Sequence, residues 1–117
     1  MTVYGIPNCD TVKKALTWLK ANKVDFQFHD FKKEGITAKK LQEWDKKAGY
    51  EKFLNKNSTV WKEVDDQTKA TITSAETAFP LLKEKTSIIK RPVIEDGKFL
   101  FFGFDEKVYR EHFVKIS

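Results

Sequence analysis

The stretch that decides the fold is Thr2-Val3-Tyr4-Gly5-Ile6-Pro7-Asn8-Cys9-Asp10-Thr11-Val12, because the spacing of apolar residues changes within it. Residues 2–6 are rich in β-branched and aromatic side chains and stop at a proline, which predicts a short strand. From residue 10 the apolar positions 12, 15, 16 and 19 follow the i, i+3, i+4, i+7 spacing of an amphipathic helix, which should end near residues 21–23. A loop at residues 7–9 joins the two elements.

A second strand is predicted directly after this helix. Val24, Phe26 and Phe28 alternate with polar residues, as in a strand with one buried face. Because strand, helix and strand follow one another without a hairpin turn, they predict a parallel β-α-β unit.

The middle of the chain is predicted to be helical. Thr37 is placed to cap a helix that ends at Gly49, and residues 58–64 predict a helical turn around Trp61. Residues 73–76 match a capping box that opens a helix reaching residue 82, and Pro80 should kink that helix or move its start.

The last third predicts a hairpin followed by a helix. Residues 93–102 form two apolar runs joined by Asp96-Gly97, and Asp105 is placed to cap a final helix that carries Val108, Tyr109 and Phe113. The sequence therefore predicts an α/β fold of order β-α-β, helical insertion at about residues 36–88, then β-β-α, around one four-stranded mixed sheet. Residues 1–117 are expected to form a single domain.

Composition excludes several classes of protein. With 40% hydrophobic and 33% charged residues, the chain has too much apolar material for a disordered protein and too much charge for a membrane protein. The net charge of +5 comes mostly from lysines mixed with acidic residues, and only Arg91 and Arg110 are arginines. We therefore expect solvated helix surfaces and no direct nucleic-acid partner. No signal peptide or membrane span is recognisable, so a cytoplasmic location is expected.

Cys9 is the only cysteine, which excludes an intramolecular disulfide and a zinc site built from cysteines. Its place at a helix start, next to the polar residues Asn8 and Thr11, favours a reactive thiolate, whereas the neighbouring carboxylate of Asp10 disfavours one. The alternative is a small buried apolar residue. His29 and His112 are too scattered to predict a metal site, so both are expected to be structural or exposed.

A second candidate is the Arg91-Pro92 pair, which directly precedes a predicted strand. Cis peptide bonds occur almost only before proline, and a cis bond here would place backbone groups opposite the Cys9 loop. In the alternative interpretation, Pro92 only begins the strand and Arg91 is solvated.

The chain resembles the ArsC (arsenate reductase) family over nearly its whole length. The resemblance is carried by residues 4–15, by the Ile-Lys-Arg-Pro-Val motif at residues 89–93 and by Phe102-Gly103-Phe104. Within the family the sequence is most similar to the YffB branch, through a Phe-His-Asp segment at residues 28–30 and through Leu54-Asn55 followed by Trp61. Spx-type transcriptional regulators are a sister branch.

The resemblance implies a thioredoxin-like fold and places the reactive cysteine of the family at Cys9. It also assigns Arg91 to one of three arginines that bind the oxyanion in arsenate reductases. Asn55 occupies the position of a second arginine, and residues 101–103 offer none for the third. Arsenate reduction is therefore the least favoured function, because a guanidinium group is hard to replace at a doubly charged oxyanion.

The favoured hypothesis is a glutathione-dependent thiol reductase of the ArsC/YffB type, with Cys9 as nucleophile and Arg91 as catalytic partner. Since Val12 stands where Spx-type proteins carry a second cysteine, an outside thiol from glutathione or glutaredoxin must complete the reaction. The residues expected to bind substrate or glutathione are Asn8, Asp10, Thr11, Asn55 and Pro92. We expect a monomer with glutathione as co-substrate and no bound cofactor. The alternative is an Spx-like regulatory module that binds RNA polymerase or another protein.

Overall fold

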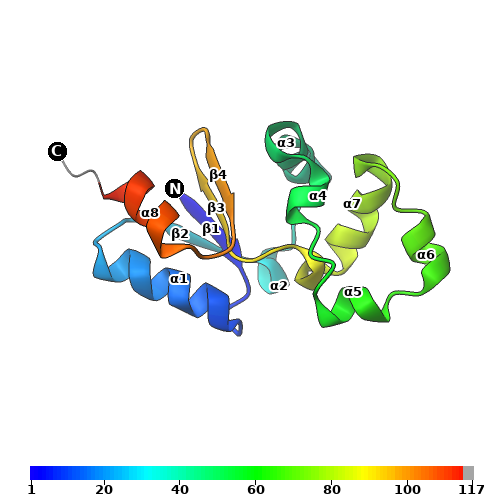
Figure 1. The fold of residues 1–117 in the computed structure, drawn as a ribbon, viewed down its shortest axis with the longest axis horizontal. Helices are drawn as coiled ribbons and strands as arrows, with labels where there is room; N and C mark the ends of the chain where they lie inside the picture. The colour runs from blue at the N-terminus through cyan, green and yellow to red at the C-terminus, as the bar shows by residue number, and fades with distance from the viewer. Residues whose placement is uncertain (115–117) are drawn as a thin grey trace. The chain divides into compact units, whose positions relative to one another are not determined.

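A computed structural model describes residues 1–114 (Figure 1). Its contacts group the chain into two compact units, which we call the sheet unit (Met1–Asp30 and the segment from Arg91 onward) and the helical unit (Phe31–Lys90). The single domain with an insertion at about residues 36–88 stays a prediction. No helix within residues 1–114 combines the length and apolarity that crossing a membrane requires.

The sheet unit contains one four-stranded mixed sheet, as predicted. Its strands are β1 (Thr2–Gly5), β2 (Gln27–Asp30), β3 (Val93–Asp96) and β4 (Phe99–Phe102). Their order is β2-β1-β3-β4, with β1 parallel to β2 and antiparallel to β3, and with β3 antiparallel to β4. The predicted parallel β-α-β unit and the C-terminal hairpin are therefore confirmed.

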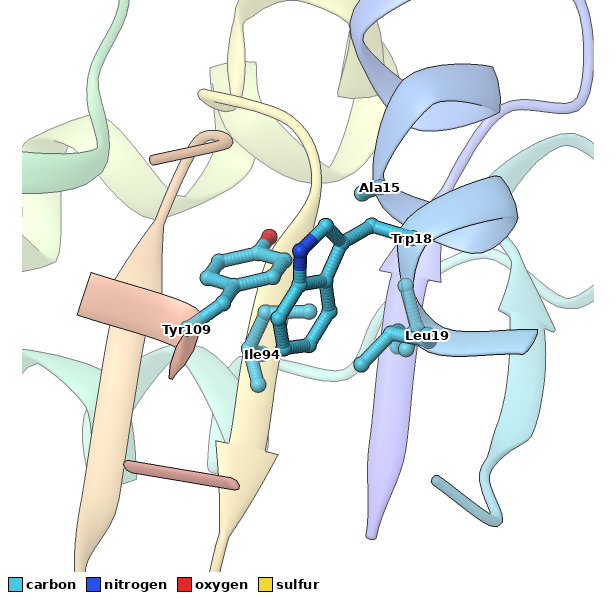
Figure 2. Packing of buried hydrophobic residues seen from close by; sticks show 6 residues of the cluster. Ala15, Trp18, Leu19, Ile94 and Tyr109 are labelled. Carbon is cyan, nitrogen blue, oxygen red and sulfur yellow. The ribbon is translucent and has the colours of Figure 1, made fainter. Parts of the chain in front are cut away.

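Two helices contribute to the core of the sheet unit. They are α1 (Asp10–Ala21) and α8 (Glu106–Phe113), which Asp105 caps by accepting a hydrogen bond from the Val108 N–H, as predicted. Figure 2 shows Trp18 and Leu19 projecting from α1 toward Tyr109 and Ile94. Together with Val3 and Ala15 these residues form one buried cluster, so both helices pack against the same face of the sheet.

Tyr109 is the centre of this cluster and is fully buried. Its ring meets Trp18 edge-on at a centroid distance of 5.6 Å and Phe104 at 5.1 Å. Its hydroxyl donates to the Gly103 carbonyl oxygen at 2.7 Å, and the Gly103 N–H donates in turn to the Pro92 carbonyl oxygen at 2.8 Å. Tyr109 therefore connects α8 to the segment that begins β3.

The second strand begins later than the alternation of Val24, Phe26 and Phe28 predicted. Lys23 turns the chain with φ of 59°, and the Val24 N–H donates to the Leu19 carbonyl of α1 rather than to a strand. Pairing with β1 begins only at Gln27. Val24 and Phe26 nevertheless pack against the core cluster, which accounts for their apolar character.

The hairpin turn also differs from the prediction by one residue. Asp96 is still paired, with Phe99, so the two-residue loop is Gly97-Lys98 and not Asp96-Gly97. Gly97 has φ of 60°, a left-handed conformation that glycine adopts without steric cost.

The helical unit consists of short helices joined by tight turns. Its elements are α2 (Phe31–Glu34), α3 (Ala38–Ala48), α4 (Tyr50–Phe53), α5 (Thr59–Glu63), α6 (Asp66–Ala70), α7 (Ala75–Glu84) and a 3-10 turn, η1 (Thr86–Ile88). Trp44, Trp61 and Leu82 are buried. Leu54 and Ile89 form a single antiparallel bridge that ties the end of α4 to the end of η1.

Of the helix caps in this unit, the predicted cap at Thr37 is confirmed, the cap at Ser58 was not predicted, and the predicted capping box is shifted by one residue. The Thr37 hydroxyl accepts from the Lys40 N–H at the start of α3, and the Ser58 hydroxyl accepts from the Trp61 N–H at the start of α5. The capping box of α7 joins Ser74 to Thr77, one residue later than the predicted box at residues 73–76. The helix then continues through Pro80, which does not move its start.

Gly5 is required where α1 approaches β1. A Cβ atom on Gly5 would lie 2.9 Å and 3.3 Å from the two methyl carbons of Val12, which is fully buried. We expect Gly5→Ala to lower the free energy of unfolding by about 1–3 kcal/mol, because overpacking forces the first turn of α1 outward. Urea unfolding measures the change.

Val12→Ala provides the matched control for Gly5→Ala. It removes both methyl groups that an added Cβ would meet. The double variant should therefore lose less stability than the sum of the two single variants. Strict additivity would show that the contact between residues 5 and 12 is not the source of the strain.

Tyr109 makes the stability of the chain sensitive to alkali. Burial, together with the nearby Asp105 carboxylate, raises the pKa of the Tyr109 hydroxyl well above its ordinary value of 10.0. Below pH ~10 the hydroxyl is neutral in both folded and unfolded chains. Above pH ~10 the unfolded chain releases the proton first, so the contribution of Tyr109 to stability is lost as the pH rises.

Tyr109→Phe should therefore cost about 1 kcal/mol at pH 7, through the lost hydrogen bond to Gly103. Its stability should then decline less steeply than that of the unmodified chain between pH 9 and 11. Unfolding midpoints across this range measure both effects. Parallel decline of the two proteins would contradict the assignment.

Candidate functional site at the start of helix α1

Cys9 is the N-cap residue of α1, which confirms its predicted place at a helix start. Its backbone is extended, with φ of −131° and ψ of 125°, and its carbonyl accepts from the Lys13 N–H at 2.9 Å. The side chain is a free thiol, half-buried, and makes no capping hydrogen bond. The sulfur therefore lies at the positive end of a 12-residue helix without being used to hold that helix.

The loop that carries Cys9 is fixed at both ends. Ile6, at the end of β1, is buried, and Val12 is inserted against Gly5 one turn into the helix. Asn8, Asp10 and Thr11 are exposed around the half-buried cysteine. Three of the four predicted site residues at positions 8–11 thus form a polar edge around the sulfur of the fourth, Cys9.

The Arg91-Pro92 segment lies at the same end of the sheet. β1 and β3 are antiparallel and pair Tyr4 with Val93, so the residues preceding β3 are level with the end of β1, where the Cys9 loop begins. The Arg91–Pro92 peptide bond is cis, which confirms the bond geometry considered from the sequence. Pro92 is buried, and Arg91 is half-buried with its Nε atom inside the protein.

Asn55 is the one predicted site residue that lies in the helical unit. Its backbone N–H donates to the Ile88 carbonyl at 2.7 Å, and its side-chain oxygen accepts from the Asn57 N–H at 3.0 Å. Both bonds shape the turn between α4 and α5. The structure brings residues 8–11, Arg91 and Pro92 to one edge of the sheet unit, whereas Asn55 belongs to the other unit.

The two histidines have structural partners. His112 places its Nε2 atom 2.9 Å from an Asp96 carboxylate oxygen and stacks on Phe99 at a centroid distance of 3.7 Å. The His29 ring lies 4.8 Å from the ring of Tyr4. Within residues 1–114, no three side chains of the His, Cys, Asp or Glu type meet in a way that could hold a metal ion.

A groove along α1 was not identified from the sequence. It has a volume of about 470 Å³ and is lined by Lys13, Lys14, Thr17, Trp18, Ala21 and Phe104. Part of the groove could have been found in the sequence, because Cys9, Lys13, Thr17 and Ala21 follow one another at i, i+4 spacing along the predicted helix. Phe104 could not, because it is brought next to this row only by the folding of the chain.

Comparison with known proteins shows the same fold in related chains. The sequence matches the ArsC family over residues 4–112. It is 42% identical to a protein of Haemophilus influenzae described only as uncharacterized, over 97% of this chain and 98% of that one. It is 30% identical to the global transcriptional regulator Spx 1 of Lactococcus lactis, over 92% of this chain and 84% of that one.

A solved structure described as a YffB protein superposes with a TM-score of 0.89 at 38% identity, over 94% of this chain and 96% of that one. This similarity confirms the predicted thioredoxin-like fold and the resemblance to the YffB branch. With the family match spanning residues 4–112 and the cysteine at the helix start in place, the chain belongs to the ArsC family.

Proposed function

We propose that this protein is a thiol oxidoreductase that reduces mixed disulfides with glutathione as co-substrate and Cys9 as nucleophile. The observation that carries the proposal is the half-buried Cys9 thiol, which caps α1 without a side-chain hydrogen bond at the sheet edge it shares with Arg91-Pro92. Helix N-termini favour the thiolate, which is the attacking form of cysteine.

The reaction requires two exchange steps because the chain has one cysteine. The Cys9 thiolate attacks the glutathionyl sulfur of a mixed disulfide, the S–S bond breaks, and the substrate leaves as a thiolate that takes up a proton. A second glutathione, as thiolate, then attacks the glutathionyl sulfur bound to Cys9. Glutathione disulfide leaves and Cys9 returns to the thiolate, so the net reaction converts one mixed disulfide and one glutathione into the substrate thiol and glutathione disulfide.

The neighbouring residues suit the binding of an anionic tripeptide. The Arg91 guanidinium group can orient a glutathione carboxylate, since its planar fork matches two carboxylate oxygens. We assign Asn8, Asp10 and Thr11 to the polar edge around the sulfur, and the backbone around Pro92 to pairing with the bound tripeptide. Asn55, in the helical unit, is a further candidate for binding glutathione or substrate. Glutaredoxin is an alternative source of the second thiol, and the enzyme is proposed to act as a monomer in the cytoplasm.

A second candidate function is a regulatory module that binds RNA polymerase or another protein. The observation in its favour is the 30% identity to the transcriptional regulator Spx 1 over most of both chains. Arsenate reduction is less favoured, because Asn55 and residues 101–103 supply no arginine where the family's oxyanion site has them.

Incubation of the intact protein with glutathione disulfide tests the leading proposal. We expect one glutathione adduct per chain by intact mass, reversed by added glutathione, because Cys9 is the only thiol. Cys9→Ser should form none while keeping the circular dichroism of the unmodified chain. A folded protein that stays unmodified would refute the enzyme hypothesis and favour the regulatory module.

The role of Arg91 is tested by comparing a charged with a neutral disulfide substrate. Arg91→Lys keeps the positive charge but loses the planar fork, so the rate at which glutathione disulfide transfers a glutathionyl group to Cys9 should fall roughly ten- to a hundredfold, the range of a charged hydrogen bond. The rate with bis(2-hydroxyethyl) disulfide, which carries no carboxylate, should change little. An equal loss with both substrates would show that Arg91 supports the fold or the thiol, not glutathione recognition.

A further inference from the structure

The groove on α1 lies directly in line with Cys9. Lys13, Thr17 and Ala21 continue the i, i+4 row that begins at Cys9, and all three line the groove. Because a helix rises about 1.5 Å per residue, the groove extends from roughly 6 to 18 Å beyond the cysteine along α1. A molecule that brings a disulfide to the Cys9 sulfur can therefore extend into it.

The floor of the groove is aromatic and rigidly held. Trp18 and Phe104 form it, and the Tyr109 ring contacts both edge-on. The Trp18 indole nitrogen is buried and has no hydrogen-bond partner within residues 1–114, and Figure 2 shows it on the side of the ring toward Tyr109. The floor therefore presents apolar ring surface and no hydrogen-bond donor from the indole.

The rim nearest Cys9 is positively charged. Lys13 and Lys14 are exposed, and neither forms an ion pair within the part of the chain that the structure describes. The Arg110 guanidinium, which is not a lining residue of the groove, lies 6.0 Å from the centre of the Trp18 ring and pairs with the Glu106 carboxylate at 3.0 Å. A ligand with an apolar group and a nearby carboxylate matches both the floor and the rim.

We propose that this groove binds the polypeptide part of a glutathionylated protein substrate. The inference rests on the proposed function, and it names the substrate class of the same site. The middle of the groove is ~12 Å from the cysteine along the helix, and an extended peptide covers about 3.3 Å per residue, so an apolar residue about four positions from the modified cysteine would reach the floor. A neighbouring carboxylate would lie near Lys13 and Lys14.

The chemistry is the exchange already described, with the polypeptide as leaving group. The Cys9 thiolate forms a disulfide with the glutathionyl sulfur, and the polypeptide thiolate departs and is protonated. Glutathione then regenerates Cys9 and leaves as glutathione disulfide. Binding in the groove would position the polypeptide sulfur and would give a preference that glutathione alone cannot supply.

Two glutathionylated hexapeptides test the proposal. In the first, glutamate stands two positions and leucine four positions after the modified cysteine. In the second, lysine replaces the glutamate and serine replaces the leucine. We expect kcat/KM for the first peptide to exceed that for the second by about tenfold or more, since burying most of a leucine side chain is worth at least the 1.4 kcal/mol of a tenfold change.

Variants locate the preference in the groove. Lys13→Glu/Lys14→Glu and, separately, Thr17→Trp should reduce the ratio of the two peptide rates to near one. Lys20→Glu changes an exposed residue of the same helix outside the groove and should keep the ratio. A preference that survives both groove variants would overturn the assignment.

Glutathione disulfide, assayed beside the peptides, separates this inference from the proposed function. If it transfers a glutathionyl group to Cys9 while the two peptides react equally fast, the groove does not select the substrate and the inference fails alone. If neither glutathione disulfide nor any peptide transfers a glutathionyl group to Cys9, the proposed function itself fails.

Discussion

The close approach of Val12 to Gly5 is the contact on which the rest of the sheet unit depends. A Cβ atom at position 5 of β1 would have no space there, so this contact holds the first turn of α1 against the strand. Cys9 lies one turn before this contact, so the contact determines where Cys9 lies relative to β1. The same contact sets the rotation of α1 about its axis, which turns Trp18 toward the core and leaves Lys13 and Thr17 at the surface. The thiol and the groove are thus two consequences of one packing constraint.

Tyr109 is the second residue that positions the candidate site, because it contacts both α1 and the segment that begins β3. Its ring packs against Trp18 from α1, and its hydroxyl reaches through Gly103 to Pro92. One buried side chain therefore connects the helix that carries the cysteine with the strand start that carries Arg91. The hydrogen bond also satisfies a hydroxyl that would otherwise be costly to bury. Tyr109 thus contacts α1 directly and the start of β3 through Gly103.

Local rules accounted for most of the elements. The apolar spacing along α1, the Thr37 and Asp105 caps and the apolar hairpin runs are properties of neighbouring residues, so they could be predicted. The start of β2 could not, because it depends on the left-handed turn at Lys23 and on a hydrogen bond back to Leu19. The Cys9 position followed from the sequence for the same local reason. The groove did not, because the spacing of apolar residues along α1 contains nothing about the packing of Trp18 and Phe104 against Tyr109.

A single cysteine also limits where specificity can reside. With no second thiol in the chain, both exchange steps pass through the same sulfur and the same glutathionyl group. Contacts to glutathione around Arg91 would be common to every substrate and would lower the barrier equally for all of them. Discrimination between substrates must then come from surface that touches only the leaving polypeptide. The groove along α1 is such a surface, because it begins one turn beyond Cys9 and continues away from it along the helix.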